Sequence, residues 1–173
     1  MTVNQPKSSC CSGGEAKSSG NDELHVAIIG SGSAAFACAI KAAEGGARVT
    51  IIEANEDIGG CCVNVGCVPS KILIRAAQLA QQQRSNPFVG LENQAPLLSR
   101  SLLAKQQTSR VSELRAAKYQ NILDNNPALS LIKGYASFKD AHTLVVSKPD
   151  GQEVEVIADR FLIATGSTPT IPP

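Results

Sequence analysis

Two cysteines five positions apart, Cys62 and Cys67, are the residues of this chain best suited to chemistry. On a regular helix five residues advance by about 500°, which leaves the two Cα atoms about 140° apart around the axis. The thiols could form a disulfide only if Cys62 lies in a loop before the helix, with the Cα atoms within about 7 Å of each other. Gly59, Gly60 and Gly66 favour such a loop.

The residues around this pair favour redox chemistry. Cys67 is expected near the N-terminus of a helix that runs to about Arg84, and a helix N-terminus favours a thiolate. Pro69 restricts where that helix starts, because proline is tolerated only in the first turn. Lys71 follows on the same face, where it can support a nearby anion or reduced cofactor. A disulfide across five residues removes little loop entropy, so we interpret the pair as a redox couple rather than a structural crosslink.

Two alternatives remain for the pair, a reduced structural pair and part of a zinc site. Zinc is disfavoured because no second cysteine pair follows and because His25 and His142 lie elsewhere in the sequence. We expect both histidines to have structural or surface roles. Cys38, on a predicted helix, is expected to be a small buried hydrophobic residue.

A second candidate site follows the first predicted strand. It is a glycine-rich turn with the pattern G-x-G-x-x-[G/A], made of Gly30, Ser31, Gly32, Ser33, Ala34 and Ala35. The first glycine permits a tight turn, the second lets a pyrophosphate approach the backbone, and the small last residue lets helix and strand pack closely. Free N–H groups at the helix N-terminus would face the phosphates. Glu53 would accept hydrogen bonds from ribose hydroxyls, although the pattern does not separate FAD from NAD.

The elements that must position both sites alternate along the chain. A strand over 24–30, a helix over 33–44 and a strand over 48–53 make a βαβ unit, which implies a parallel sheet. Helices are predicted from the cysteine loop to Arg84 and over 99–124. Short strands are predicted over 128–133, 135–139, 143–148, 153–158 and 160–166, with a hairpin turn at 149–151. We therefore expect an α/β fold, a Rossmann-like domain with a parallel sheet plus a small antiparallel β-meander.

The composition argues against several classes of function. Of 173 residues, 43% are hydrophobic and 18% are charged, so a globular core can form. A formal net charge of +1 and an aromatic content of 3% give no reason to expect nucleic acid as a partner. The apolar runs are strand-sized, which predicts no membrane insertion.

Residues 1–22 differ in character from the rest of the chain. They are rich in Ser, Gly and Lys and have no hydrophobic period, so we expect a flexible tail followed by one folded domain over 23–173. They also lack the apolar centre of a secretory signal, which predicts a cytoplasmic protein. In that compartment six cysteines favour redox chemistry or metal binding over structural disulfides.

Three motifs together resemble the FAD-dependent pyridine nucleotide–disulfide oxidoreductases. GSGSAA, GGCCVNVGCVPSK and IATGSTP occur in that family's order and approximate spacing, and the resemblance covers about residues 24–173. Within the family, CVNVGCVPSKILIRAAQLA and LLAKQQTSRVSELRAAKYQNIL resemble the mercuric reductase group rather than dihydrolipoamide dehydrogenase or glutathione reductase.

The resemblance implies a role for each motif. Cys62 and Cys67 would be the redox-active disulfide, with Cys67 as the charge-transfer thiolate against the flavin and Cys62 as the outer, exchanging thiol. Lys71 would lie near the reactive edge of the flavin ring, and Ala136 would meet the adenine. The residues implied for FAD binding are Gly30, Gly32, Ser33, Ala34, Ala35, Glu53, Gly60, Cys61, Lys71, Ala136, Thr165 and Gly166, of which the last two would close over the cofactor.

The resemblance also implies a reaction. NADPH would reduce FAD, the flavin would reduce the disulfide, and Hg(II) bound by the thiolates would accept two electrons and leave as elemental mercury. Thiolates select soft ions such as Hg(II) over oxygen ligands, so the dithiol suits that substrate. The alternatives are a disulfide oxidoreductase like dihydrolipoamide dehydrogenase, and a non-catalytic fragment that binds FAD or metal through its thiols.

Three departures from the family pattern are expected to matter. The chain ends before the family's NADPH motif, returning FAD segment and dimerisation domain, so we expect a portion of a longer enzyme that is a homodimer when complete. Position 61 is Cys where the family usually has Thr, which adds a competing thiol. We also expect the chain to lack the N-terminal metal-binding domain common in mercuric reductases. In its place, Cys10 and Cys11 are either a mobile trap that passes Hg(II) to Cys62 and Cys67 or part of an inert tail.

Overall fold

The structure is a computed structural model that describes residues 23–168 and 170–172. Its elements follow in the order β1 (His25–Ile29), α1 (Ser33–Glu44), β2 (Arg48–Glu53), α2 (Gly60–Asn64), α3 (Cys67–Arg84), α4 (Arg100–Arg115), the π-helical segment η1 (Ala116–Gln120), α5 (Asn121–Asp124), β3 (Leu129–Lys133), β4 (Tyr135–Phe138), β5 (Thr143–Ser147), β6 (Glu153–Ile157) and β7 (Arg160–Ile163). The tail predicted over 1–22, with Cys10 and Cys11, lies outside the described residues.

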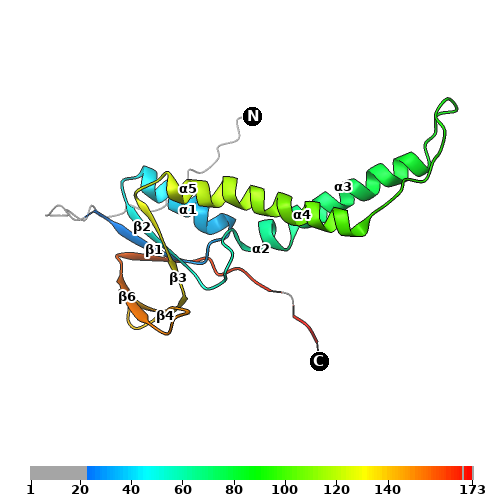
Figure 1. The fold of residues 1–173 in the computed structure, drawn as a ribbon. Coiled ribbons are helices and arrows are strands. Elements are labelled where there is room, and N and C mark those ends of the chain that lie inside the picture. The colour runs from blue at the N-terminus through cyan, green and yellow to red at the C-terminus, as the bar shows by residue number, and fades with distance from the viewer. Residues whose placement is uncertain (1–22, 169, 173) are drawn as a thin grey trace, which may run out of the picture.

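The central sheet is parallel, with the strand order β3-β2-β1-β7. In its register Ile28 of β1 lies opposite Ile51 of β2 on one side and Leu162 of β7 on the other. Parallel neighbours need a crossover connection, and α1 supplies the one between β1 and β2 (Figure 1). The carboxyl ends of β1, β2 and β7 therefore meet at one edge, where both candidate sites begin.

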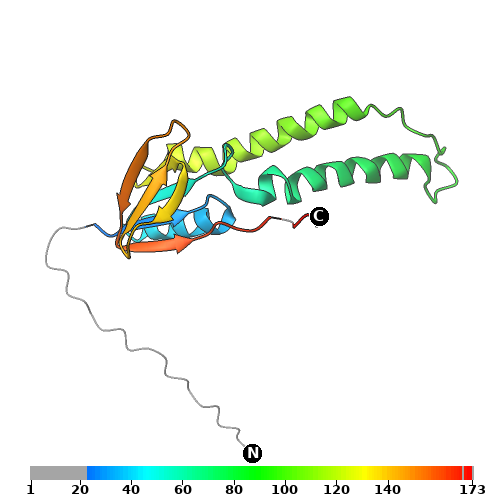
Figure 2. The ribbon, with the colours of Figure 1, turned by 90° about the horizontal axis from the view of Figure 1, so that it is seen from below.

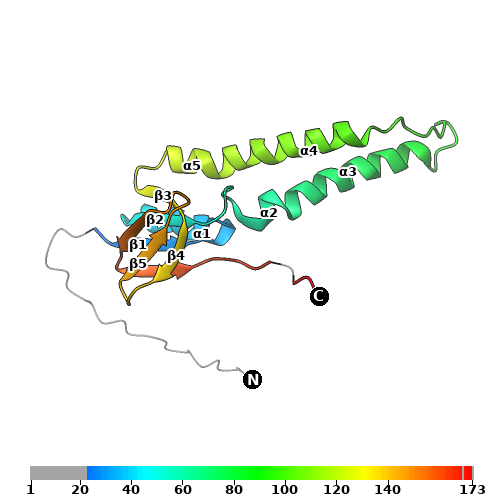
Figure 3. The same ribbon diagram turned by 60° about the horizontal axis from the view of Figure 1, so that its bottom comes forward.

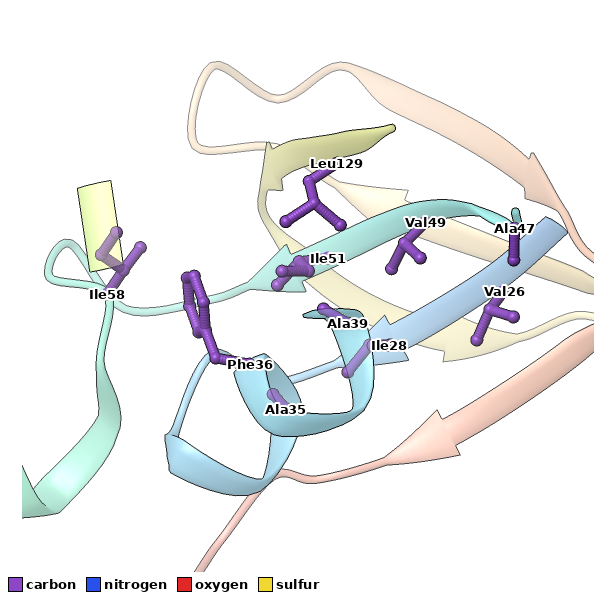
Figure 4. Packing of buried hydrophobic residues seen from close by; sticks show 10 residues of the cluster. All are labelled: Val26, Ile28, Ala35, Phe36, Ala39, Ala47, Val49, Ile51, Ile58 and Leu129. Atoms are coloured by element: carbon purple, nitrogen blue, oxygen red, sulfur yellow. The ribbon is translucent and has the colours of Figure 1, made fainter. Parts of the chain in front are cut away.

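One face of the parallel sheet packs against α1. Ile28 and Ile51 have no exposed surface and project toward this helix (Figure 4). The facing residues of α1 include Ala35 and Ala39, also fully buried. Because these side chains are small, the helix can lie close to the strands, which is the role predicted for Ala35.

The other face of the parallel sheet is covered by the antiparallel meander β4-β5-β6 (Figure 2). Ala27 and Ile52 of the parallel sheet pack there against Leu144, Val146 and Val156 of the meander. Burial on both faces explains why the parallel strands are continuous apolar runs rather than alternating ones. The predicted fold class, a Rossmann-like parallel sheet with a small antiparallel meander, is confirmed.

Two long helices, α3 and α4, form an antiparallel hairpin that extends away from the sheets (Figure 3). None of the 18 residues of α3 is buried, and Val111 is the buried residue of α4. The single helix predicted over 99–124 is corrected in one respect: it begins at Arg100 and is interrupted by η1 before it continues as α5. A π-helical turn accommodates one extra residue, and so it changes which side chains face the sheet.

The two histidines have the structural and surface roles that were predicted. His25 is buried, with its Nδ1 2.7 Å from the carbonyl oxygen of Ile157 and its Nε2 2.8 Å from Oγ1 of Thr50. Burial lowers the pKa of His25, because the charged ring would lose its hydration. His142 is exposed in the turn before β5. Within the described residues no helix is both long and apolar enough to cross a membrane.

Candidate active site

The glycine-rich turn begins at a position where only glycine fits. Gly30 has a φ of +105°, and a Cβ built there would lie 2.3 Å from the carbonyl oxygen of Ala164. Its N–H donates to the carbonyl oxygen of Ile52 at 2.7 Å. The turn is therefore held against the ends of both neighbouring strands, with no room for a side chain.

The N-terminus of α1 is open to solvent at this turn. Gly32 is the N-cap and provides no side-chain hydrogen bond, and the first turn of the helix carries no acidic residue. Ser33 and Ala34 are exposed. Unpaired N–H groups and the positive end of the helix dipole make such a terminus a site for a phosphate or diphosphate. The 12-residue helix and its side-chain-free entrance fit the predicted cofactor.

The start of α2 lies directly against this helix terminus. Gly60 has a φ of +68°, and a Cβ at Gly60 would lie 2.8 Å from the Cα of Gly32. The two backbones can approach so closely only because Gly60 lacks a side chain, whereas a Cβ at Gly32 would lie 3.8 Å from the Cα of Gly60. This contact places the residues that follow Gly60, including both members of the cysteine pair that α2 leads into, beside the glycine-rich turn.

Glu53 is buried and fully hydrogen-bonded. Its Oε2 accepts from the N–H of Ser31 at 3.0 Å and from the Ser31 hydroxyl, and its Oε1 accepts from the N–H and the Nδ2 of Asn55, each at 2.8 Å. Burial raises the pKa of Glu53, but these donors outweigh burial and hold the pKa below its ordinary value. The sequence did not single out Ser31 or Asn55 as partners of Glu53. Asn55 is exposed, so its side-chain contact is the one that a ribose hydroxyl could replace.

The remaining predicted cofactor residues lie at the same edge of the parallel sheet or near it. Thr165 and Gly166 follow β7 and are exposed, and the Cα of Thr165 lies 3.2 Å from a Cβ built at Gly30. Ala136 is half-buried in β4, two residues after Gly134, whose N–H donates to the carbonyl oxygen of Glu53. The structure thus brings these positions around the glycine-rich turn and Glu53.

The cysteine pair lies in residues 60–67, here called the dithiol segment. The prediction that Cys62 lies in a loop is wrong, because Cys62 belongs to the short helix α2. This helix ends at once: the N–H groups of Val65 and Gly66 both donate to the carbonyl oxygen of Cys61, at 3.0 and 2.8 Å. A new helix, α3, then starts at Cys67 with Gly66 as its N-cap. The break between two helices brings the thiols together, as the loop was expected to do.

The two thiols of the pair are exposed and interact with each other. A hydrogen bond with the Cys67 thiol raises the pKa of Cys62, and the loss of hydration and the negative charge of Cys67 act in the same direction. The backbone N–H of Cys67 and the charge of Lys71 oppose this shift in pKa. Lys71 is exposed on α3 and lies close enough to act on the pair, as the sequence predicts.

Among the described residues, Cys38 and Cys61 do not complete a metal site with the pair. Cys38 is half-buried on α1 and packs against the core, close to its predicted role. Across residues 23–168 and 170–172, no group of three or more His, Cys, Asp or Glu side chains is placed to hold a metal ion.

Two residues of the long helix that sequence reasoning did not assign to the site hold it in place. Tyr119, in η1, packs edge-on against Phe36 with ring centroids 4.9 Å apart, and its hydroxyl is 3.4 Å from Oγ of Ser33. One turn earlier, Arg115 forms an ion pair with Asp57 in the segment that leads to α2. A tyrosine in an amphipathic helix gives no sequence signal for this contact, because η1 alters the helical register.

A family model described as pyridine nucleotide-disulphide oxidoreductase matches residues 24–173. The chain belongs to this family. The mercuric reductase of Shewanella putrefaciens is 70% identical over 171 residues, which make up 99% of this chain and 31% of that protein. The mercuric reductase of Acidithiobacillus ferrooxidans is 53% identical over 163 residues, 94% of this chain and 30% of that protein. The chain thus spans about a third of the length of the curated relatives it matches.

Solved structures of a flavoprotein disulfide reductase share the fold. The Cu(II) complex of RclA, an HOCl-induced flavoprotein disulfide reductase from Escherichia coli, superposes with a TM-score of 0.71 at 29% identity. The match covers 88% of this chain and 30% of RclA. A second RclA structure gives a TM-score of 0.69 at 28% identity. The resemblance of the sequence to the pyridine nucleotide–disulfide oxidoreductases is therefore confirmed, while the roles of single residues stay predictions.

Proposed function

We propose that this chain is the flavin- and dithiol-bearing part of an enzyme that reduces Hg(II) to elemental mercury with NADPH as electron donor, in mercury detoxification. The observation that carries the proposal is the exposed, hydrogen-bonded pair of Cys62 and Cys67 next to a backbone cradle for a diphosphate. Identity of 70% with a protein named mercuric reductase supports Hg(II) as the substrate.

The chain's own residues fit the proposed cofactor. The open N-terminus of α1 would hold the diphosphate of FAD, and Glu53 with Asn55 would hold the ribose. When bound, FAD supplies the two-electron chemistry that connects NADPH with a dithiol. The residues proposed to hold FAD are Gly30, Gly32, Ser33, Ala34, Ala35, Glu53, Gly60, Cys61, Lys71, Ala136, Thr165 and Gly166. We place the NADPH site in the part of the enzyme outside this chain.

The dithiol segment is proposed to bind the substrate ion. Hg(II) is soft and prefers two thiolates, and both Cys62 and Cys67 are open to solvent. Binding to both sulfurs displaces the proton that Cys62 keeps in the free pair. Lys71 favours the thiolate form of Cys62 through its positive charge, and so it assists the loss of that proton.

The setting of this reaction is part of the proposal. We propose that residues 23–173 form the FAD-binding portion, that the complete enzyme is a homodimer, and that it acts in the cytoplasm. We keep the alternative that Cys10 and Cys11 pass Hg(II) to the pair. The second candidate function is reduction of a disulfide, which the likeness to the flavoprotein disulfide reductase RclA favours.

The first experiment is the visible absorption spectrum of the purified chain, with and without added FAD. Bound flavin is expected to give its absorption bands, and a long-wavelength thiolate-to-flavin band should be absent in the reduced Cys67→Ser variant. The matched control is Cys38→Ala, which removes a thiol from α1 and should keep that band. A chain that stays colourless and takes up no FAD would contradict the cofactor assignment for this segment.

A second experiment tests the ion. Hg(II) titration followed by ultraviolet thiolate-to-metal absorption should show binding at the pair that the Cys62→Ser and Cys67→Ser variants lose and Cys38→Ala retains. The Cys10→Ser/Cys11→Ser variant should bind substoichiometric Hg(II) more weakly if the tail is a trap. NADPH oxidation by a full-length protein that carries this segment, with Hg(II) compared against lipoamide, separates the two candidate functions.

A further inference from the structure

We infer that Cys61 is a third redox thiol, able to replace Cys62 as the disulfide partner of Cys67. This inference rests on the redox pair proposed above and adds a residue that no family motif assigns to the disulfide. The dithiol segment would then have two disulfide registers, Cys62–Cys67 and Cys61–Cys67, in place of one.

In the turn between α2 and α3, Cys61 lies against Gly66, the residue before Cys67. The carbonyl oxygen of Cys61 accepts hydrogen bonds from the N–H groups of Val65 and Gly66, at 3.0 and 2.8 Å. The Sγ of Cys61 lies 3.4 Å from the position that a Cβ of Gly66 would occupy. Cys67 is the next residue, so the Cys61 sulfur packs on the short segment that carries the Cys67 sulfur.

Gly66 keeps this approach open. A side chain at position 66 would come within 3.2 Å of the Cys61 carbonyl oxygen and would occupy the space in front of the Cys61 sulfur. The absence of that side chain leaves Cys61 exposed and unobstructed on this side. Cys38, by contrast, is half-buried on α1 and packs against the core.

The three neighbouring thiols point to disulfide exchange rather than to a metal site. In the part of the chain that the structure describes, Cys61, Cys62 and Cys67 do not form a three-residue group placed to hold an ion. Disulfide exchange needs two sulfurs at a time, and so it does not require all three to converge on one point.

The step is an isomerisation that needs no oxidant. The Cys61 thiolate attacks the Cys67 sulfur of the Cys62–Cys67 disulfide. The Cys61–Cys67 bond forms as the Cys62–Cys67 bond breaks, and the electron pair leaves on the Cys62 sulfur, which takes up the proton that Cys61 released. The number of disulfides and the oxidation state of the protein do not change. The product leaves Cys62, the proposed outer thiol, free to bind a soft ion.

The test maps disulfides in the full chain after oxidation with diamide. Free thiols are blocked with N-ethylmaleimide, and trypsin releases one peptide, 49–71, that contains all three cysteines and neither Cys38 nor the tail cysteines. In the wild type, label on Cys61 reports the Cys62–Cys67 bond and label on Cys62 reports the Cys61–Cys67 bond. We expect both labelled forms of the peptide.

Two variants separate this inference from the proposed redox pair. After oxidation, Cys62→Ser should carry no N-ethylmaleimide on the two remaining cysteines of the peptide, because Cys61 and Cys67 form a disulfide. Cys61→Ser should also carry none, because Cys62 and Cys67 form a disulfide. If only Cys61→Ser is protected from labelling, the inference is wrong and the proposed Cys62–Cys67 pair is kept. If neither variant is protected, the proposed Cys62–Cys67 pair is itself wrong. Circular dichroism confirms that each variant is folded, and a non-reducing gel confirms that the bonds are intramolecular.

Discussion

The glycine-rich turn and the dithiol segment lie against each other, yet they are built in opposite ways. In the turn, Gly30 is wedged between strand ends and Glu53 uses both carboxylate oxygens in hydrogen bonds to its neighbours. In the dithiol segment, Cys61, Cys62 and Cys67 are all exposed. In the proposed enzyme the turn holds a fixed backbone shape, whereas the thiols are reached by other molecules and change partners. Substitutions in the first region should therefore change stability, and substitutions in the second should change reactivity.

The largest effect is expected at Gly30. Gly30→Val combines a left-handed φ of +105° with a Cβ 2.3 Å from a backbone oxygen, so we expect no folded protein by circular dichroism. Gly46→Ala is the matched control, because Gly46 has a φ of +81° but no atom within 4 Å of its Cβ position. It should cost only about 1 kcal/mol. Equal losses at both positions would mean that the turn is not wedged as described.

The next effect is expected in the core that supports the turn. Ile51→Ala removes a fully buried side chain from β2 and should reduce the free energy of unfolding by about 2–5 kcal/mol in urea denaturation. Val65→Ala, in the dithiol segment, is the control, because Val65 is 73% exposed. Its effect should stay within about 0.5 kcal/mol. A comparable loss for Val65→Ala would contradict the contrast between the two regions.

A smaller effect, dependent on pH, is expected at Glu53. Its pKa is lower in the folded chain than the ordinary 4.5, so the carboxylate contributes stability that is present above pH 4.5 and is lost as the pH falls through the folded value. Glu53→Gln should cost about 1–3 kcal/mol at neutral pH, since it disrupts buried hydrogen bonds. Thermal melts should show a shallower decline below pH 4.5 for Glu53→Gln than for the wild type. If the stability of both proteins fell equally steeply below pH 4.5, Glu53 would not be the source of the acid sensitivity.

The smallest effect on stability, and the most specific one on reactivity, is expected at the thiols. Cys67→Ala removes the hydrogen-bonding thiol that raises the pKa of Cys62, so Cys62 should become a thiolate at lower pH and react several-fold faster with iodoacetamide at neutral pH. Lys71→Ala should slow the reaction of Cys62 by removing a favourable charge. Mass mapping of the tryptic peptide that carries Cys62 gives both rates; this peptide is 49–71 in Cys67→Ala and 49–75 in Lys71→Ala, which lacks the cleavage site at position 71. A Cys62 rate unchanged by Cys67→Ala would show that the thiols do not interact.

The fold was largely predictable because its local patterns agree with its packing. The apolar runs of β1 and β2 are buried on both sides, and the alanine-rich α1 is the helix that such a sheet can accommodate closely. The turn after β1 was equally clear, since a glycine pattern between a strand and a helix has few other uses. The π-helical interruption at η1 was not predictable, because the apolar spacing of 99–124 fits a continuous helix.

The site residues named from the sequence stay predictions, and the sequence did not predict their geometry. The spacing of Cys62 and Cys67 indicated that the chain must break between them, but α2 rather than a loop provides that break. Glu53 was expected to face a ribose, whereas the structure shows it already bound by Ser31 and Asn55. The partners of Glu53 depend on contacts between elements that are distant in sequence. The position of the break depends on the turn between the adjacent helices α2 and α3.

The sequence by itself determined which residues are candidates for redox chemistry and for binding a phosphate, namely thiols five apart and glycines where the backbone must come close, and it determined the apolar strands that favour a parallel sheet. Only the tertiary structure decided how these parts meet. It placed Gly60 against Gly32, packed Tyr119 near Ser33, and turned Cys61 toward the residue before Cys67. Local propensity acts within a few residues, whereas the contacts of Gly60 with Gly32 and of Tyr119 with Ser33 form when α1 packs against the sheet and η1 packs against α1, which brings separate parts of the chain to van der Waals distance.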